Sequence, residues 1–575
     1  MKRQYFLISL IVSLFMFSHA QVPQSLRVLN YVPDECYSVS VMHLDSIAKN
    51  CELQALDKDH VLNVFYKKSK FVKSFVKSWI NKDDKLGVDF TSAMAYCNSN
   101  LIMIPLNDEK KFEKLLSDIV KTKLPFESIG VGGIPVRYIA YAESEVMSVH
   151  LFCTDDMAFA FLYVANSNVE KVPSREIVIQ QCSELFHSKF LQSVEGKYFV
   201  DNKMSSYVYY SPESPYTKQI LNTVTAKLGA KEAKDALNQM NIKTFTRGEV
   251  RKNKMTSVMQ IFEGEGPLIS KGIGEDQMRS DQLEKLLPYA GSAPLAIMTC
   301  NVQGIGEMMS PVMSAFPSFK PLVDFVNNPF LIRYNADNVL FVSMVDQEQD
   351  VRKSLDKYVK EFNWTKDSTY KAAKEMYEKY AKQLNGESEE SEEENEEEIN
   401  YFMMGMLYAT MGSDSLSGRK SLMHENMDGW DVYTILTSKR SYEEEVVVEE
   451  VLEEGAEPKE KEEQEPVLAY DSAYVLVHDG MLFFTNSKDA FDDIRKPSGK
   501  PQNVPVDEML SRPVYATADL ATLVAMSGVR VDIPFSDLVI YDEGNTVVTT
   551  FNAVRGLKHG MFYEIVKIVS DLMRK

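Results

Sequence analysis

The chain has 575 residues, of which 45% are hydrophobic, 11% aromatic and 25% charged. This length allows about two to four domains, and the composition is that of a globular protein, not of a disordered, fibrous or multi-spanning membrane chain. The net charge of −20 is concentrated in two runs: residues 387–398 hold nine Glu, and residues 443–465 hold twelve Glu against two Lys. The rest of the chain is nearly neutral, which argues against a nucleic-acid partner because phosphate binding needs a basic surface.

The first twenty residues have the pattern of a secretory signal peptide. Lys2 and Arg3 precede a largely apolar run, Tyr5–Phe17, and a cleavage point follows Ala20. This run is too short for a membrane span of about 20 residues, and no later segment reaches that length. We therefore expect a periplasmic or secreted protein that is soluble, with no membrane span, after signal cleavage.

All six cysteines lie in the first 300 residues: Cys36, Cys51, Cys97, Cys153, Cys182 and Cys300. Export permits disulfides, but the sequence leaves their pairing open. Cys97 and Cys153 stand in apolar strand-like segments and are interpreted as buried free thiols. On proximity in the sequence, Cys36 with Cys51 is the first pair to test.

Four segments of the first half of the chain recur in the same order in the second. Residues 31–47 match 289–305, and residues 98–120 match a segment ending at Val359. Residues 135–142 and 149–167 match 431–438 and 473–487, and residues 204–209 match 510–515. The second match is a strand and an amphipathic helix with its N-cap at Asn107 or Asp346. The third contains strand pairs that turn at Asp155–Asp156 or Asp479–Gly480. The matches predict an α+β fold of two tandem related repeats, each an antiparallel sheet packed with helices.

We place the signal peptide at 1–20, repeat A at 21–266 and repeat B at 267–575. The offset between matched residues grows from 239 at Asn107 to 296 at Val136 and to 324 at Asp155. Repeat B therefore contains two insertions, at about 366–425 and 441–468, and each includes one acidic run. Because runs of like charge are typically solvated and long surface loops are tolerated, we expect both insertions to be disordered.

Three short motifs, VPDE at 32–35, LGVDF at 86–90 and KKFEKLL at 110–116, carry a family resemblance. The chain resembles an uncharacterised family of exported Bacteroidota proteins with two related α+β halves, over most of its mature length. This resemblance implies the fold and the export, but no activity. Many members look like lipoproteins, whereas no Cys directly follows the signal here.

The sequence holds no specific motif for catalysis, a metal or a nucleotide. The histidines are scattered without metal-ligand spacing, so we assign no catalytic, cofactor-binding or metal-binding residue. Gly130–Gly133 lacks the residues of a phosphate loop and is interpreted as a turn between a helix and a strand. The methionine-rich segment Tyr401–Met411 is interpreted as a short helix covering the core of repeat B, with an adaptable partner surface as the alternative.

Asp-Ser followed by an apolar residue or Thr occurs four times. The pattern is similar to the O-glycosylation acceptor sequence of exported Bacteroidota proteins, which makes Ser46, Ser368, Ser415 and Ser472 candidates. Ser46 also fits a helix cap. Ser415 and Ser472, in or beside the insertions, are the favoured sites.

These features favour a component of the cell envelope that is a non-catalytic binding or assembly module, with an envelope protein or a glycan as its partner and no cofactor. The alternative is a periplasmic hydrolase whose site lies between the two repeats and uses carboxylates such as Asp155 and Asp156. The sequence leaves the ligand and the oligomeric state open.

Overall fold

The computed structural model describes residues 27–574, except for 142–146, 165–171, 218–240, 268–277, 305–324, 346–349, 385–418, 442–466, 528–532 and a few single or paired positions. The predicted signal peptide, both acidic runs, the segment 401–411 and Ser415 lie outside the described residues. In the described part, helices and strands are mixed and every strand pairing is antiparallel, which confirms the expected α+β class.

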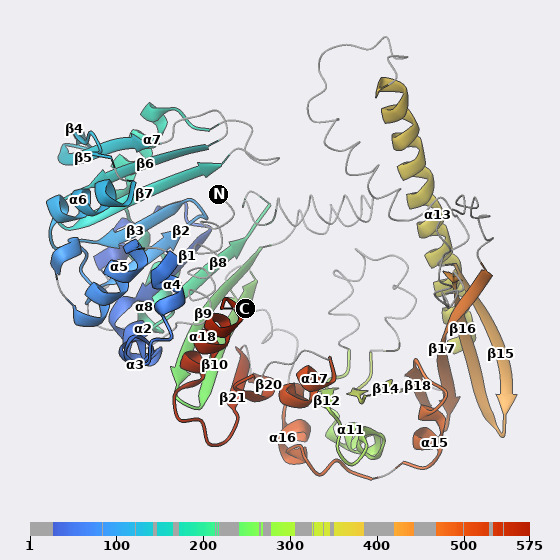
Figure 1. Cartoon of the computed structure of the whole chain (residues 1–575). Coiled ribbons are helices and arrows are strands. Elements are labelled where there is room, and N and C mark those ends of the chain that lie inside the picture. Colours follow the sequence, from blue (N-terminus) through green and yellow to red (C-terminus); the bar gives the residue numbers. More distant parts are fainter. Residues whose placement is uncertain are drawn as a thin grey trace, which may run out of the picture.

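The described strands form one sheet (Figure 1). From the outer edge to the middle, the first half contributes β4 (Glu127–Val131), β5 (Ile134–Tyr141), β6 (Met147–Cys153), β7 (Met157–Val164), β3 (Leu101–Pro105), β2 (Ala93–Cys97), β1 (Ser38–His43), β8 (Ser206–Tyr210), β9 (Ile242–Arg251) and β10 (Lys254–Glu263). The short strand β11 (Gly266–Pro267) pairs with the end of β10.

The second half continues the sheet from the middle to the far edge. Its strands are, in that order, β21 (Thr546–Ala553), β20 (Phe535–Glu543), β19 (Val514–Asp519), β12 (Ala296–Cys300), β13 (Phe330–Tyr334), β14 (Val339–Met344), β18 (Met481–Thr485), β17 (Val467–His478), β16 (Trp430–Ser441) and β15 (Lys420–Met427). Outward from the middle, the first half has β10, β9, β8, then β1, β2, β3, then β7, β6, β5, β4. The second half has β21, β20, β19, then β12, β13, β14, then β18, β17, β16, β15. The two halves therefore have the same strand order.

The two halves meet where β10 pairs with β21, over seven residue pairs from Lys254–Asn552 to Gln260–Thr546. We call this strand pair the seam. Since the ladder runs on through the seam without an edge, the two halves share one hydrogen-bonded sheet.

The register places the two largest cores on one face of this sheet. Directly opposite residues share a face, and Tyr541 lies opposite Val548, which lies opposite Val258. Two residues along β10 from Val258, Gln260 lies opposite Phe245. Phe245 belongs to the core of the first half and Tyr541 packs against that of the second, so both cores lie on the same side.

Helices cover both faces. The face with the two largest cores packs against η1 (Arg27–Tyr31), α7 (Arg175–Leu185), η3 (Phe190–Gln192) and α8 (Val194–Asp201) in the first half, and α11 (Ser280–Leu286), η5 (Leu287–Ala290), α15 (Ala490–Arg495) and α16 (Val506–Ser511) in the second. The opposite face packs against α2 (Leu44–Asn50), α3 (Leu53–Lys58), α4 (Asn63–Lys68), α5 (Lys70–Asn81), η2 (Asp84–Leu86) and α6 (Glu109–Val120) in the first half, and the long α13 (Val351–Leu384) in the second. The short α17 (Leu520–Met526) lies next to β20.

The last helix, α18 (Met561–Leu572), belongs to the second half of the chain but packs on the first, near β9 and β10 (Figure 1). Its Tyr563 joins the hydrophobic cluster of α3 and α4. Just before it, His559 Nδ1 lies 2.8 Å from the Glu52 carboxylate, and the Gly560 amide donates to that carboxylate at 2.6 Å. The α18 contacts therefore fasten the two halves together at a second place.

Two of the three offsets that the sequence matches predict, 239 and 324, agree with the residue pairing between strands within the two halves. Leu101 pairs with Phe161 in the first half, and Leu340, 239 residues after Leu101, pairs with Thr485, 324 residues after Phe161. The third offset is wrong by two residues. Arg137 pairs with Cys153, and the residue opposite Val477, 324 residues after Cys153, is Asp431, which gives 294 instead of 296. A slip of two keeps each side chain on its face, so hydrophobic pattern alone did not detect it.

Several local predictions need correction. The cap of α6 is Asp108, not Asn107: its carboxylate accepts the Lys111 amide at 3.0 Å. Asp350 does the same for Lys353 in α13, and the predicted cap Asp346 lies outside the described residues. The glycines at 130–133 lie in the hairpin from β4 to β5, not between a helix and a strand. Gly132 and Gly133 have φ of 57° and 81°, the left-handed values that a tight hairpin turn requires.

The predicted insertion at 366–425 contains regular structure at both ends, because α13 runs to Leu384 and β15 begins at Lys420. The expected helical face of α13 is confirmed, since Val351, Leu355 and Val359 are all buried.

The six cysteines are buried free thiols, which confirms the prediction for Cys97 and Cys153. The pair Cys36–Cys51 is wrong. Cys36 lies in the large core of the first half and Cys51 in the cluster on the other face of the sheet. The sheet itself separates these two thiols.

Candidate functional site

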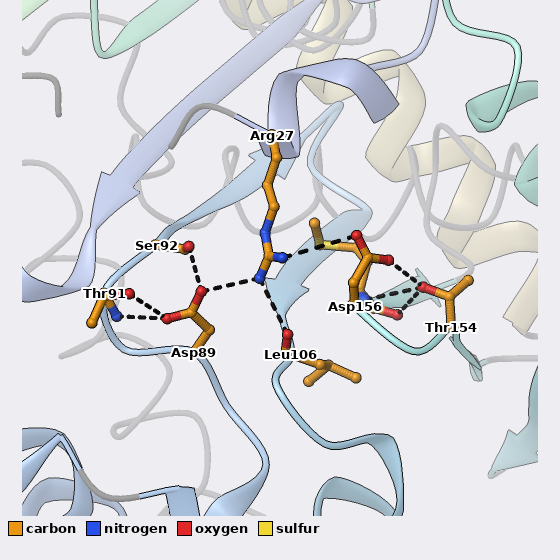
Figure 2. A network of polar contacts seen from close by, with 8 residues as sticks. Arg27, Asp89, Thr91, Ser92, Leu106, Thr154 and Asp156 are labelled. Carbon is orange, nitrogen blue, oxygen red and sulfur yellow. Dashed lines mark hydrogen bonds and ion pairs between the residues drawn. The ribbon is translucent and has the colours of Figure 1, made fainter. Parts of the chain in front are cut away.

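The turn that the hydrolase alternative would use joins β6 to β7, and Figure 2 shows its second carboxylate beside Arg27 of η1. Arg27 Nη1 lies 3.9 Å from the Asp156 carboxylate. Arg27 Nη2 donates to Asp89 at 3.1 Å and to the Leu106 carbonyl at 3.2 Å. Asp155, the other residue of the turn, is exposed. The guanidinium thus connects three separate segments of the first half.

Asp89 is the best-connected carboxylate of this network (Figure 2). It accepts hydrogen bonds from the Ser92 hydroxyl at 2.5 Å, the Thr91 hydroxyl at 2.6 Å and the Thr91 amide at 3.0 Å. Burial alone would raise the pKa of Asp89, but these hydrogen bonds and Arg27 hold it below its usual value. Asp89 is therefore the ionised partner that fixes Arg27.

The corresponding turn of the second half has Gly480 at the position of Asp156. In the first half the Leu106 amide donates to the Asp156 carbonyl at 2.9 Å, and in the second half the Val345 amide donates to the Gly480 carbonyl at 2.8 Å. The backbone contact is the same with or without an acidic side chain. We therefore assign the carboxylate turn and Arg27 a structural role, as a joint between η1 and the strand ends.

The candidate glycosylation sites occupy different surroundings. Ser46 is half-buried inside α2 and does not cap it, because the N-cap of α2 is His43; it lies beside an Asp45–Lys82 ion pair of 2.7 Å. Ser368 falls within α13. Ser472 is half-buried in β17, opposite Leu436 of β16. The structure brings none of these three together, and all four sites stay predictions.

The sheet surface of the second half has a hollow of about 170 Å³, lined mainly by side chains of four neighbouring strands. Two rows of directly opposed residues form it: Ile332, Met298, Ala516 and Ile540 in one row, and Tyr334, Ala296, Ala518 and Leu538 in the next. The three alanines stand in the two middle strands, between larger side chains at the sides. Their small size produces the depth.

This hollow lies on the face that α13 covers farther out, because Ile332 is opposite Phe341, which packs on the α13 cluster. Its lining is almost wholly apolar, with Thr517 and Tyr334 as the members that carry a hydroxyl. Met298 and Tyr334 are each 37% exposed. An apolar recess with exposed walls is a typical place for a partner's apolar group.

Asp542 stands two residues beyond Ile540, on the same face of β20. It is only 4% exposed, and neither carboxylate oxygen has a hydrogen-bond partner that meets normal geometry. Burial raises its pKa to about 6, although the Glu543 amide and Arg512 act in the opposite direction. The apolar rows thus end at a buried acid whose charged form is poorly stabilised.

The hollow was not predicted from the sequence, although the residue types of the β12 segment indicate an unusual surface there. In the first match, Ala296 and Met298 stand where Ser38 and Ser40 stand in the first half. The β12 segment is therefore apolar at positions facing both ways, whereas β1 has hydroxyls on the corresponding face. An apolar run on both faces of a strand indicates a covered or partner-binding surface.

Comparison of the chain with protein-family models, with curated proteins and with solved structures gives no match. Among the described residues, no group of three or more His, Cys, Asp or Glu is placed to hold a metal ion. No helix in that part of the chain has the length and hydrophobicity that a membrane crossing needs.

Proposed function

We propose that the chain is an exported protein of the cell envelope that binds another protein and performs no catalysis. The hollow on β13, β12, β19 and β20 is its docking site, and it receives one apolar side chain of the partner. The observation that carries this proposal is the pair of opposed apolar rows with alanines in the middle.

The size and chemistry of the hollow favour a protein partner over a glycan. An apolar cavity of about 150 Å³ holds a benzene-sized group, so about 170 Å³ suits one aromatic or branched aliphatic side chain. Sugar hydroxyls would lose water there without enough polar groups to replace it, at a cost of about 1–3 kcal/mol for each unpaired group. Single buried anchors of this kind commonly dominate protein–protein affinity.

We also propose that the two halves are related repeats. Their identical strand order outward from the seam supports this relationship, as does the shared register at Leu101 and Leu340. On this view the halves have diverged at the face of β1 and β12: Ser38 and Ser40 keep it polar in repeat A, and Ala296 and Met298 make it apolar in repeat B. Partner binding belongs to repeat B.

The proposal can be tested by photo-crosslinking in cells of the source organism. A photoreactive amino acid replaces Met298, at the wall of the hollow, and in a matched control it replaces Val194, an 81% exposed residue of α8. We expect one discrete protein adduct from position 298 and none from position 194. The adduct should disappear when Ala518→Trp fills the hollow without changing the melting temperature. Equal adducts at both positions, or an adduct that Ala518→Trp leaves unchanged, would refute the docking site.

A further inference from the structure

We propose that Cys36 and Cys97, which are free thiols in the computed structure, join in a disulfide when the chain folds in an oxidising compartment. The expectation of such a compartment rests on the export in the proposed function, but the choice of this pair comes from the geometry of the first half.

Cys36 and Cys97 lie on the same side of the sheet. Both residues belong to the same core, with Cys36 8% and Cys97 0% exposed. Val39, three residues after Cys36, pairs directly with Cys97, and the Cys36 thiol donates to the Ser38 carbonyl at 3.2 Å. Besides burial, the nearby Cys36 raises the pKa of the Cys97 thiol. Three other cysteines fit less well: Cys51 and Cys153 lie in the cluster on the opposite face, and Cys300 belongs to the second half.

Asn98 fixes the backbone around both cysteines. Its side-chain oxygen accepts the amides of Tyr37 and Ser38 at 2.8 and 3.1 Å, and its side-chain nitrogen donates to the Glu35 carbonyl at 3.0 Å. The Asn98 amide donates to the Ser38 carbonyl at 3.0 Å. A side chain next to Cys97 thus holds the residues around Cys36 in place. Such a clamp limits how far the two Cα atoms can separate, which is the condition a disulfide needs.

The disulfide would also close a long loop of the chain. A Cys36–Cys97 bond encloses α2, α3, α4 and α5, the helices on the opposite face of the first half. Cross-linking a loop of about 60 residues constrains the unfolded chain strongly. In the second half, the first match puts Pro294 at the position of Cys36, so this bond would distinguish the first half from the second.

The chemistry requires an oxidant, and we infer a protein disulfide of a thiol oxidase. The Cys36 thiolate attacks one sulfur of the oxidant's disulfide and releases its first thiol; the Cys97 thiolate then attacks Cys36 Sγ and releases the second. Two thiols of the chain lose two electrons and two protons, and one disulfide of the oxidant becomes two thiols. Because burial raises the pKa of Cys97 and suppresses its thiolate, the reaction belongs to the folding chain, before the core closes.

The test uses the full chain, unfolded under reduction and refolded with oxidised and reduced glutathione. Free thiols are then alkylated, and the protein is digested without reductant for mass spectrometry. We expect a Cys36 peptide joined to a Cys97 peptide, about 2 Da lighter than the two reduced peptides together, and four alkylated cysteines. Alkylated Cys36 and Cys97, or a bond from Cys36 to any other cysteine, would overturn the proposal.

Matched variants separate the bond from general packing. Cys97→Ala and Cys182→Ala both remove a fully buried thiol from the same core. Oxidation should raise the melting temperature of the wild type and of Cys182→Ala by several degrees, and leave that of Cys97→Ala unchanged. If Cys97→Ala does not fold, Cys36→Ala replaces it. Cell fractionation reports on export separately, so a reduced protein found in the cytoplasm would count against the proposed function and not against the pairing.

Discussion

Ser257 of β10 and Thr549 of β21 lie opposite each other at the midpoint of the seam, with three further residue pairs on each side. A half-turn about this pair exchanges β10 with β21: Lys254 takes the place of Thr546, and Gln260 takes that of Asn552. The strand order on either side of the seam then coincides as well. The seam is therefore the place where the two halves are most directly joined.

Thr549→Pro should destabilise the whole sheet. Thr549 pairs with Ser257 on one side and Ile540 on the other, so proline removes a ladder hydrogen bond and its ring disturbs a central strand. We expect a loss of about 3 kcal/mol or more in the free energy of unfolding, measured with denaturant. Thr549→Val keeps the amide and suits a strand, and it should change stability by less than about 1 kcal/mol. Equal effects of both variants would show that the seam hydrogen bonds contribute little.

Asp89→Asn should loosen the joint at Arg27. The pKa of Asp89 is lower in the folded protein than in the unfolded chain, so its ionised form stabilises the fold above the unfolded pKa of about 4, and this contribution is lost as the pH falls below that value. We expect Asp89→Asn to lower the unfolding free energy by about 1–3 kcal/mol at pH 7, with a smaller difference near pH 3. Asp155→Asn, at the exposed turn residue, is the control and should stay within about 0.5 kcal/mol of the wild type. A pH-independent difference would argue against the ionic role of Asp89.

Asp542→Asn should have the opposite effect. The pKa of Asp542 rises to about 6 on folding, so the folded state binds a proton more tightly and loses stability as the pH increases from about 4 to 6. Removing the buried charge should stabilise the protein by about 1–3 kcal/mol at pH 7, and the gain should vanish below about pH 4. Glu543→Gln, an exposed neighbour, is the control for denaturant curves at both pH values. A destabilised Asp542→Asn at pH 7 would mean that the charged carboxylate has a partner in solution.

Glu52→Gln should release α18 locally without unfolding the sheet. The Glu52 carboxylate contacts the His559 ring and accepts a hydrogen bond from the Gly560 amide. The uncharged side chain of glutamine would bind these two groups less strongly than the carboxylate does. We expect hydrogen exchange of the amides of 561–572 to become about tenfold faster, which corresponds to about 1.4 kcal/mol of local opening. Exchange in β4 to β7 should be unchanged. Uniformly faster exchange would instead indicate that α18 unfolds together with the first half.

Much of the fold followed from the alternation of residue types, and the misses have local causes. The matched strands around Leu101 and Leu340 were found because buried apolar residues repeat in both, and such residues fix register. The cap of α6 was misplaced because Asn107 and Asp108 have equal capping chemistry, and only the backbone path decides which side-chain oxygen accepts the Lys111 amide. The strand pairing that creates the hollow joins residues such as Ala296, Tyr334 and Ala518, which are far apart in sequence. No local pattern reports which strands become neighbours.

The position of α18 has a consequence for the order of events during synthesis. All ten strands of the first half, from β1 to β10, leave the ribosome before residue 264, but the cluster around α3 and α4 needs Tyr563 to be complete. Domains usually fold as units in the order in which they are made. Here the cluster around α3 and α4 stays incomplete until α18 has been made, which happens after all the strands of the second half from β12 to β21.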